Sequence, residues 1–463
     1  MKLDTICAIS TPPGVSGIGI VRLSGPDTYK IIEKIFTPGK ITGKRKKIKI
    51  EKIPSHTVHY GHIIENGRII DEVLLTIMKA PKSYTREDMA EIGCHGGIIP
   101  LKEVLNLCIK MGARLASPGE FTMRAFLNGR IDLSQAESVL EIINSQTEKG
   151  LEIALSKLEG NFSKKINQIR EKIINILVNF EATIDFPEEE DTERIEIECE
   201  GKIREILKEV EDILSSARRG KLLFEGVKAA IVGRTNVGKS SLLNKLIEEE
   251  RAIVSEIPGT TRDIIQEVIN IKGIPVKIID TAGIRKTKGK IEKMGVEKAI
   301  EWMKKAEINI VVIDGSQKLK KDDEKLLENI NGKEYIIAVN KIDLPLKVNI
   351  EHLKKDFDIE KIVMVSAKNG NGIEELKEKI FKIIEKGKRK SDGEIYLNLR
   401  EENLIRKLKK ALNDCLVSIK NNLTPEITVE CLREAINEID YLTGRKYNDE
   451  ILEKIFSNFC IGK

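Results

Sequence analysis

The sequence predicts a multidomain protein: an α+β N-terminal domain, then a discontinuous all-α helical domain interrupted by an α/β domain with a mostly parallel sheet. Three observations support this. The chain has 463 residues, too many for one ordinary core and enough for about three domains. Apolar strands alternate with amphipathic helices between residues 224 and 384. Apolar residues recur at helical spacing on both sides of that segment.

The N-terminal part, residues 1–117, has the pattern of a compact α+β domain. Short apolar runs at residues 19–23 and 73–78 are separated by proline and glycine, and residues 101–111 have helical spacing. We therefore expect mixed strands and helices packed into one core here.

Residues 118–223 and 385–463 are predicted to be the two parts of the helical domain. Apolar residues three and four positions apart predict long helices between residues 134 and 180. An acidic stretch at residues 187–200 is expected to interrupt them, before a further helix at about 202–219. The two helical parts should pack together, because the domain between them has its own core.

Residues 224–384 are predicted to form the α/β domain. Short apolar runs separated by amphipathic helical segments are typical of a mostly parallel sheet that is covered on both faces. The expected strands are residues 227–232, 276–279, 308–313, 335–339 and 362–365.

Composition excludes a membrane-spanning protein and points to the cytoplasm. The chain is 33% charged and 41% hydrophobic, and no run approaches the roughly 18 apolar residues that a membrane helix needs. Its start, Met1-Lys2-Leu3-Asp4, lacks the basic, apolar and small-residue segments of a secretion signal. The 7 cysteines are scattered without a C-x-x-C pair, so we expect reduced thiols. The net charge of +5 permits a polyanionic partner without arguing for one.

A phosphate-binding loop stands between a predicted strand and a helix. Gly233-Arg234-Thr235-Asn236-Val237-Gly238-Lys239-Ser240 matches the phosphate-loop pattern, and a helix is expected from Ser241 onward. The glycines let backbone N–H groups converge on phosphate oxygens, Lys239 supplies a positive charge to the β- and γ-phosphates, and the Ser240 hydroxyl can bind Mg²⁺.

Three further motifs follow in the order expected of a guanine-nucleotide site, each at the carboxyl end of a predicted strand. Asp280-Thr281-Ala282-Gly283 can organise Mg²⁺ and contact the γ-phosphate. Asn340-Lys341-Ile342-Asp343 offers the Asp343 carboxylate to the two donors on the Watson–Crick edge of guanine, and adenine would not match it. Backbone N–H groups of Ser366-Ala367-Lys368 can support the guanine oxygen. Ile284 stands where Ras-type enzymes have a glutamine that orients the attacking water. Hydrolysis must therefore use another group to orient that water.

Several further segments lie along nearly the whole chain. They are Thr11-Pro12-Pro13-Gly14, Gly19-Ile20-Val21-Arg22, Ser83-Tyr84-Thr85-Arg86-Glu87-Asp88, His95-Gly96-Gly97, Pro118-Gly119-Glu120-Phe121-Thr122-Met123-Arg124-Ala125-Phe126-Leu127-Asn128-Gly129 and Phe459-Cys460-Ile461-Gly462-Lys463. Together with the nucleotide motifs, these segments resemble one family, the tRNA modification GTPase MnmE, also called TrmE. The resemblance extends from Thr11 to Lys463.

The resemblance implies a tRNA modification activity shared with a second protein. The N-terminal domain is expected to bind a tetrahydrofolate derivative and to form a homodimer. With the flavoprotein MnmG, the family adds an aminomethyl or carboxymethylaminomethyl group to C5 of the wobble uridine, position 34, of certain tRNAs. The carbon would come from 5,10-methylenetetrahydrofolate, and ammonium or glycine would supply the amine. FAD would belong to the partner, and no Rossmann fingerprint follows a strand here.

The resemblance also assigns the hydrolytic machinery of the G domain. Transient pairing of two G domains would depend on K⁺, held by Asn236, Ser255, Ile257 and Thr260, and Glu292 would orient the attacking water. Ser240 and Thr261 would bind Mg²⁺. The expected nucleotide-binding residues are Asn236, Val237, Gly238, Lys239, Ser240, Ser241, Ser255, Glu256, Ile257, Pro258, Gly259, Thr260, Thr261, Asp280, Thr281, Ala282, Gly283, Asn340, Lys341, Asp343, Ser366, Ala367 and Lys368.

Four residues are implied for the folate pocket: Arg22, Glu91, Arg130 and Lys463. Cations would bind the glutamate tail and the carboxylate would bind pterin nitrogens. Arg130 stands where the family often has lysine, which keeps the charge but alters the geometry. Cys460 is compatible with a nucleophile or with a structural thiol.

Two other classes of function stay open from the sequence. A GTP-switched RNA-binding or ribosome-assembly factor would carry the same G domain, although no appended RNA module is recognisable. A folate-dependent methyltransferase would have a degenerate nucleotide domain, whereas the nucleotide motifs are intact.

Overall fold

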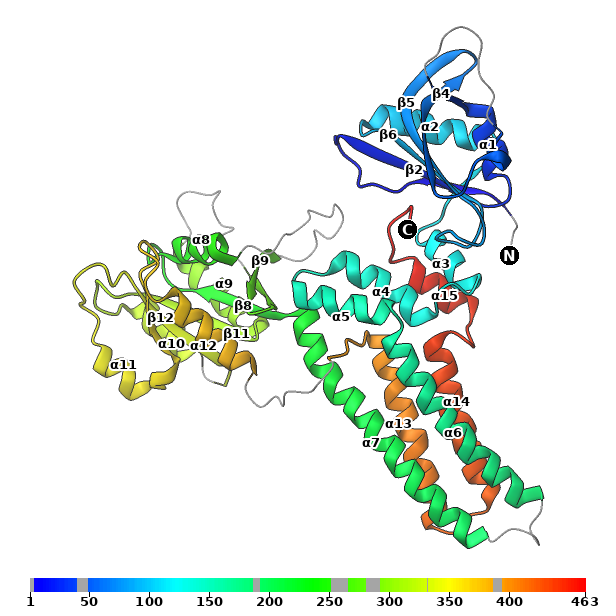
Figure 1. Cartoon of the computed structure of the whole chain (residues 1–463). Coiled ribbons are helices and arrows are strands. Elements are labelled where there is room, and N and C mark those ends of the chain that lie inside the picture. The colour runs from blue at the N-terminus through cyan, green and yellow to red at the C-terminus, as the bar shows by residue number, and fades with distance from the viewer. Residues whose placement is uncertain are drawn as a thin grey trace. The chain divides into compact units, whose positions relative to one another are not determined.

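The computed structural model separates the chain into two compact units, which are described one at a time (Figure 1). The first unit contains Met1–Leu140, Leu158–Glu181 and Pro425–Lys463; the second contains Glu141–Lys157 and Ala182–Thr424. Within the residues described, no helix is long and apolar enough to span a bilayer. The described residues are 4–39, 49–185, 192–250, 265–279, 292–330, 332–385 and 394–463.

The first unit contains a seven-stranded sheet in the order β3-β4-β5-β6-β2-β1-β7. Neighbouring strands pair antiparallel except β1 and β7, which are parallel. Helices α1 and α2 bury apolar side chains against one face, which confirms the α+β class. The elements are β1 (Ile6–Ile9), β2 (Ile18–Ser24), α1 (Thr28–Ile35), β3 (Phe36–Pro38), the 3₁₀ turn η1 (Ile50–Lys52), β4 (Thr57–Glu65), β5 (Arg68–Met78), β6 (Met89–His95), α2 (Ile98–Lys110) and β7 (Arg114–Leu115).

Helices from both predicted helical parts meet inside the first unit. They are α3 (Glu120–Leu127), α4 (Leu133–Asn144), α6 (Asn161–Asp185), α14 (Pro425–Thr443) and α15 (Asp449–Phe456). Apolar residues of α15, among them Phe456, pack against Phe126 of α3. Arg170 Nε of α6 lies 2.7 Å from Asp440 Oδ1 of α14. Segments some 270 positions apart in the chain are therefore joined by both apolar and ionic contacts.

In the second unit, two long helices lie side by side, α7 (Thr192–Glu225) and α13 (Leu399–Lys420) (Figure 1). The short helix α5 (Glu148–Leu158) also belongs largely to this unit. The predicted acidic interruption at residues 187–200 is wrong from Thr192 onward, because α7 already begins there. Glutamate is a good helix former. The i,i+4 ion pairs Glu198–Lys202 (2.7 Å) and Glu200–Arg204 (2.5 Å) stabilise the acidic first turns of α7.

The α/β part of the second unit has a six-stranded sheet in the order β13-β12-β11-β8-β10-β9. All five predicted strands are present, and only β9 runs antiparallel to its neighbour. The sequence interpretation missed β9, which pairs with β10 across a turn at Lys272-Gly273. The elements are β8 (Val227–Val232), α8 (Lys239–Glu250), β9 (Ile265–Ile271), β10 (Ile274–Ile279), α9 (Glu292–Lys305), β11 (Ile308–Asp314), α10 (Lys321–Glu328), β12 (Glu334–Asn340), α11 (Ile350–Asp356), the 3₁₀ turn η2 (Ile359–Lys361), β13 (Ile362–Met364) and α12 (Ile373–Glu385).

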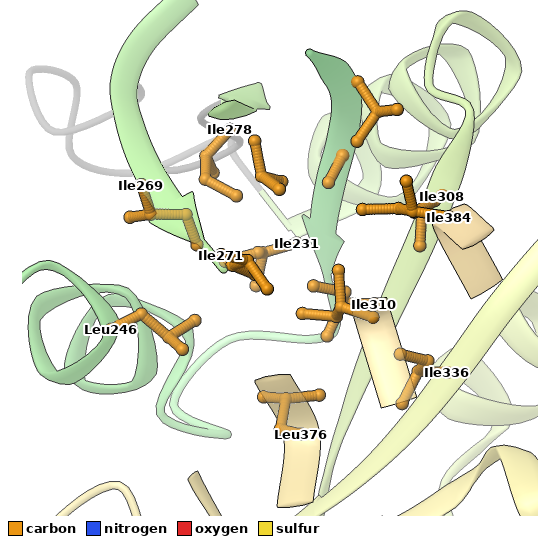
Figure 2. Close-up of a cluster of buried hydrophobic side chains, with 14 of the residues drawn as sticks. Ile231, Leu246, Ile269, Ile271, Ile278, Ile308, Ile310, Ile336, Leu376 and Ile384 are labelled. Carbon is orange, nitrogen blue, oxygen red and sulfur yellow. The ribbon is translucent and has the colours of Figure 1, made fainter. Parts of the chain in front are cut away.

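Both faces of this sheet are buried, which explains why its strands are almost continuously apolar. On one face, Ile231 and Ile310 pack with Leu246 of α8 and Leu376 of α12 (Figure 2). On the other face, side chains of α9 and α10 cover the sheet. The polar ends of the strands, and not their middles, are therefore available for a ligand.

A buried guanidinium holds the first unit together around its N-terminal strand. The Arg124 side chain of α3 is 2% exposed and lies 2.7 Å from Asp4, 3.2 Å from Glu87 and 3.0 Å from Glu120. It also donates to the Asp4 carbonyl oxygen at 2.8 Å. The hydrogen bond from Arg114 lowers the pKa of Asp4 to about 2, so the stabilisation from Asp4 is present above its ordinary value of 3.8 and is lost as pH falls toward 2.

Removal of the Arg124 guanidinium should destabilise the first unit. In Arg124→Ala, three carboxylates would lose a buried partner, which typically costs about 3–5 kcal/mol of unfolding free energy. Hydrogen–deuterium exchange at β1 and α3 measures this. Trp302, the single tryptophan, lies in the second unit and should keep its fluorescence, which separates a local effect from global unfolding. The matched control is Arg68→Ala, whose pair with Glu103 is exposed and should be worth less than about 1 kcal/mol. Equal exchange rates in the two variants would contradict the role given to Arg124.

Candidate functional site

The phosphate loop connects the end of β8 to the start of α8 through a run of unusual backbone angles. Gly233, Asn236 and Gly238 have φ angles of +154°, +62° and +97°. A Cβ atom on Gly233 would lie 2.3 Å from the carbonyl oxygen of Val312, so the loop passes close to β11. Glycine at positions 233 and 238, with asparagine in the left-handed region at 236, allows alternating backbone conformations of the kind that form anion-binding concavities.

The charged group of this loop is already held inside it. Lys239 Nζ donates to the carbonyl oxygens of Gly233 and Arg234, both at 2.8 Å. Val237 is buried, whereas Ser240 is half-buried and Ser241 is exposed in the first turn of α8. The ammonium group is therefore fixed over the loop, where it can also donate hydrogen bonds to phosphate oxygens.

Asn340, at the end of β12, joins two of the predicted motifs. Its side chain is buried; Nδ2 donates to the carbonyl oxygen of Val237 at 2.8 Å, and Oδ1 accepts from the backbone N–H of Ala367 at 3.0 Å. One amide thus fixes the phosphate loop and the loop after β13 to the same strand end. A Cβ atom on Gly238 would lie 2.3 Å from Asn340 Nδ2, so only glycine fits there.

Lys341 extends this connection to a carboxylate that the sequence interpretation missed. Lys341 Nζ donates to Asn236 O at 2.8 Å and lies 2.7 Å from Asp314 Oδ2. Burial would raise the pKa of Asp314, but hydrogen bonds from Lys341 and Ser316 outweigh it and lower that pKa. Asp314 ends the apolar strand β11, and a carboxylate directly after a run of buried residues is the signal that could have identified it.

Arg234 anchors the loop from its other side. Its side chain is 11% exposed and lies 3.1 Å from Asp323 on α10, while Nη2 donates to Gln317 Oε1 at 3.0 Å. The loop is thereby attached to β8, α10 and the segment after β11, which preorganises it for a ligand.

Asp343 follows β12 at the same edge of the sheet, and its side chain is exposed. Ser366 Oγ donates to Asp343 Oδ1 at 2.7 Å, and this hydrogen bond holds the pKa of the Asp343 carboxyl below its usual value. Ser366 is buried and Lys368 is exposed. The structure therefore brings together the phosphate loop, Asn340 to Asp343 and Ser366 to Lys368 at one edge of the sheet, and Asp343 is ionised and exposed for a base.

The remaining expected nucleotide and metal residues lie outside the described residues. These are Ser255 to Thr261 and Asp280 to Gly283. Glu292 is the first residue of α9, and its side chain lies outside the described part of the chain. Within the described residues, no group of three or more His, Cys, Asp or Glu side chains is arranged to hold a metal ion.

A second polar cluster lies in the first unit and contains all four residues expected for folate. Arg22 on β2 is opposite Glu91 on β6, and their side chains are 2.8 Å apart. Arg22 Nη1 also donates to the Gly462 carbonyl oxygen at 3.0 Å. Burial, and then the Arg22 cation, lower the pKa of the Lys463 ammonium, whereas Glu91 acts in the opposite direction. Residues 440 positions apart in the chain are therefore direct neighbours.

Tyr84 links the fourth residue to this cluster. The guanidinium carbon of Arg130 lies 4.7 Å from the Tyr84 ring centroid, and that of Arg22 lies 5.7 Å from it. The ring of Phe121 is 5.6 Å from Arg22. Tyr84 and Phe121 both occur in the segments that carry the family resemblance, but their place beside the cations was not anticipated.

The last residues of the chain are held through their main-chain carbonyl oxygens. Ser10 Oγ donates to Gly462 O at 3.1 Å, and the backbone N–H of Phe121 donates to Lys463 O at 3.2 Å. Gly462 has φ +94°, and a Cβ atom there would lie 2.5 Å from the Ile9 carbonyl oxygen. Cys460 is exposed. This tail therefore closes one side of the cluster.

A mostly parallel sheet with a phosphate loop after β8 and an Asn-Lys-x-Asp motif after β12 defines a P-loop protein with a guanine-nucleotide site. Sequence models of the MnmE helical domain and of the GTP-binding protein TrmE N-terminus match residues 133–460 and 5–130. The chain belongs to the MnmE family of tRNA modification GTPases, and it is a GTP hydrolase.

Curated relatives extend this match over the whole length. The tRNA modification GTPase MnmE of Carboxydothermus hydrogenoformans is 47% identical and covers 100% of both chains. That of Clostridioides difficile is 44% identical over 99% of both chains. The Ligilactobacillus salivarius protein is 41% identical and covers 100% of this chain and 98% of its own.

Substitution of Gly238 should disrupt nucleotide binding through Asn340. In Gly238→Ala, the added methyl group must displace the Asn340 amide and leave buried groups unpaired, so GTP affinity should fall by roughly tenfold or more. Isothermal titration with GTP measures this. The control is Gly201→Ala on α7, where a Cβ atom meets open space and affinity should not change. Wild-type affinity in Gly238→Ala would contradict the contact between Gly238 and Asn340 as a determinant of binding.

Proposed function

We propose that this protein couples GTP hydrolysis to the addition of an aminomethyl or carboxymethylaminomethyl group at C5 of the wobble uridine of certain tRNAs, together with the flavoprotein MnmG. The observation that carries the proposal is the match to tRNA modification GTPases over the full length of this chain. The chain also has two separate polar sites, one with nucleotide motifs and one with cations and aromatic rings.

The cluster around Arg22 has the chemistry that a tetrahydrofolate derivative needs. Arg22, Arg130 and Lys463 provide three cations beside one acidic partner, Glu91. Burial, and then the nearby Arg22 cation, lower the pKa of Lys463, and a bound carboxylate would offset both. Tyr84 provides an aromatic face near the cations, which suits a flat pterin ring. A 5,10-methylene derivative bound here would supply the carbon, while FAD would be contributed by the partner.

The nucleotide site is proposed to work with Mg²⁺ and K⁺. The Ser240 hydroxyl stands at the start of α8 and has no hydrogen-bond partner among the described residues, so it is free to bind Mg²⁺ with Thr261. The Asn236 side chain is exposed and likewise makes no hydrogen bond within the described part of the chain, which suits a K⁺ ligand. A cation at this place would offset charge that develops during phosphoryl transfer, when two G domains of the homodimer pair.

The wobble nucleoside tests the function directly. In cells that lack this protein, tRNA should contain wobble uridine without the aminomethyl-type group, and re-expression should restore it. Mass analysis of digested tRNA measures both. A GTP-switched ribosome-assembly factor would leave the wobble nucleoside unchanged, so an unaltered mass would reject the proposal.

Hydrolysis should require K⁺ and Glu292. We expect faster GTP turnover in potassium than in sodium salts, and a fall in kcat on the order of a hundredfold in Glu292→Ala with little change in GTP affinity. The matched control is Glu301→Ala on the same helix, where the carboxylate pairs with Lys305 and should not affect kcat. Equal turnover in the two salts would remove K⁺ from the proposal, and wild-type kcat in Glu292→Ala would remove Glu292.

The tail should contribute to folate binding and not to GTP hydrolysis. Deletion of residues 460–463 removes the Gly462 carbonyl oxygen, which accepts hydrogen bonds from both Arg22 and Ser10, and Lys463→Gln removes only a charge. Affinity for 5-formyltetrahydrofolate should fall in both, and more strongly in the deletion. Lys454→Gln on the exposed side of α15 is the control. Isothermal titration measures affinity, with the GTPase rate as a folding check. Wild-type affinity in the deletion would assign the tail to another role, such as docking the flavoprotein.

A further inference from the structure

Helices α7 and α13 line an open groove of about 510 Å³ in the second unit. Each helix contributes residues three, four and seven positions apart, which form one face of a helix. On α7 these include Glu211, Leu214 and Arg218, and on α13 they include Arg406 and Lys410. The groove is therefore lined by one face of each helix and runs along the two helices.

The lining carries an excess of positive charge. Its four cations are Arg218, Arg406, Lys409 and Lys410. Lys409 is neutralised by Glu211 at 2.7 Å, and Arg406 by Glu402 at 2.5 Å. Arg218 and Lys410 are exposed and have no ion-pair partner among the described residues. Two cations on opposite walls thus remain available to an anionic ligand.

The chemistry of the lining favours a phosphate backbone. Arginine binds phosphate oxygens through paired N–H groups and lysine acts as a point charge. Leu214 is the one aliphatic side chain of the lining, and no aromatic ring of the described residues contributes to it, so a nucleobase would find no stacking surface. A groove with cations on both walls and no base-binding face recognises the backbone without reading sequence.

We propose that the groove between α7 and α13 binds the sugar-phosphate backbone of the RNA substrate. The proposal rests on the proposed function for the identity of that RNA. It adds a positioning surface that is separate from the nucleotide motifs and from the cluster around Arg22.

The test uses the full-length protein and a fluorescein-labelled, unmodified tRNA transcript. Arg218→Gln combined with Lys410→Gln removes the two cations without a partner. We expect the Kd to rise on the order of tenfold at moderate salt, and the slope of log K against log salt to fall by about two. Glu211→Gln should have the opposite effect and tighten binding, because Lys409 is freed. Lys407→Gln removes one charge from α13 outside the groove and is the matched control.

GTP hydrolysis serves as the folding check for all four proteins. If the double variant binds tRNA with the Kd and salt slope of Lys407→Gln, the groove is not an RNA site and a protein partner becomes its better occupant. Failure of the wild-type chain to bind the transcript would overturn the proposal as well. The wobble nucleoside in cells lacking the protein is a separate measurement, so failure of the groove and failure of the proposed function can be told apart.

Discussion

The buried amide of Asn340 is the interaction on which the nucleotide site depends. It donates to the phosphate loop and accepts from the loop after β13, so two segments about 130 positions apart are held by one side chain. Both partners would be buried and unpaired without it, which typically costs about 1–3 kcal/mol for each group. The glycine at position 238 follows from the same contact, because the amide occupies the space of a Cβ atom.

A comparable constraint organises the first unit. Arg124 holds Glu87, and Ser24 bonds both Glu87 and Thr85 at 2.6 Å. The loop that carries Tyr84 is thereby fixed, and the Tyr84 hydroxyl lies 2.9 Å from the Thr122 hydroxyl on α3. Arg130 Nη1 also donates to the Tyr84 carbonyl oxygen at 3.2 Å, so the ring is held both by one of the cations and by polar groups on its other side. The position of the cluster is therefore set by buried polar groups behind it.

Chain order explains how distant residues come to share one site. The first unit is built from three separate segments, and the second unit contains most of the chain between them. The entropy of closing a loop grows only with the logarithm of its length, so inserting a domain of this size costs little. The last residues can then lie beside β1 and β2, where Gly462 meets Arg22 and Ser10.

The sequence by itself determined the elements and motifs that have a local pattern. Strand periodicity located the five predicted strands of the α/β sheet, and loop chemistry located the phosphate loop, because both depend on residues close in the chain. Family resemblance brought Arg22 and Lys463 into one predicted pocket. Tertiary structure alone decided that Asp314 neutralises Lys341 and that the Tyr84 ring lies close to two arginines. It also decided where α7 begins and how β9 pairs. Such contacts join residues that are far apart in the sequence. Buried hydrogen bonds and ion pairs leave no repeating local pattern of residues, so they cannot be predicted from the sequence alone.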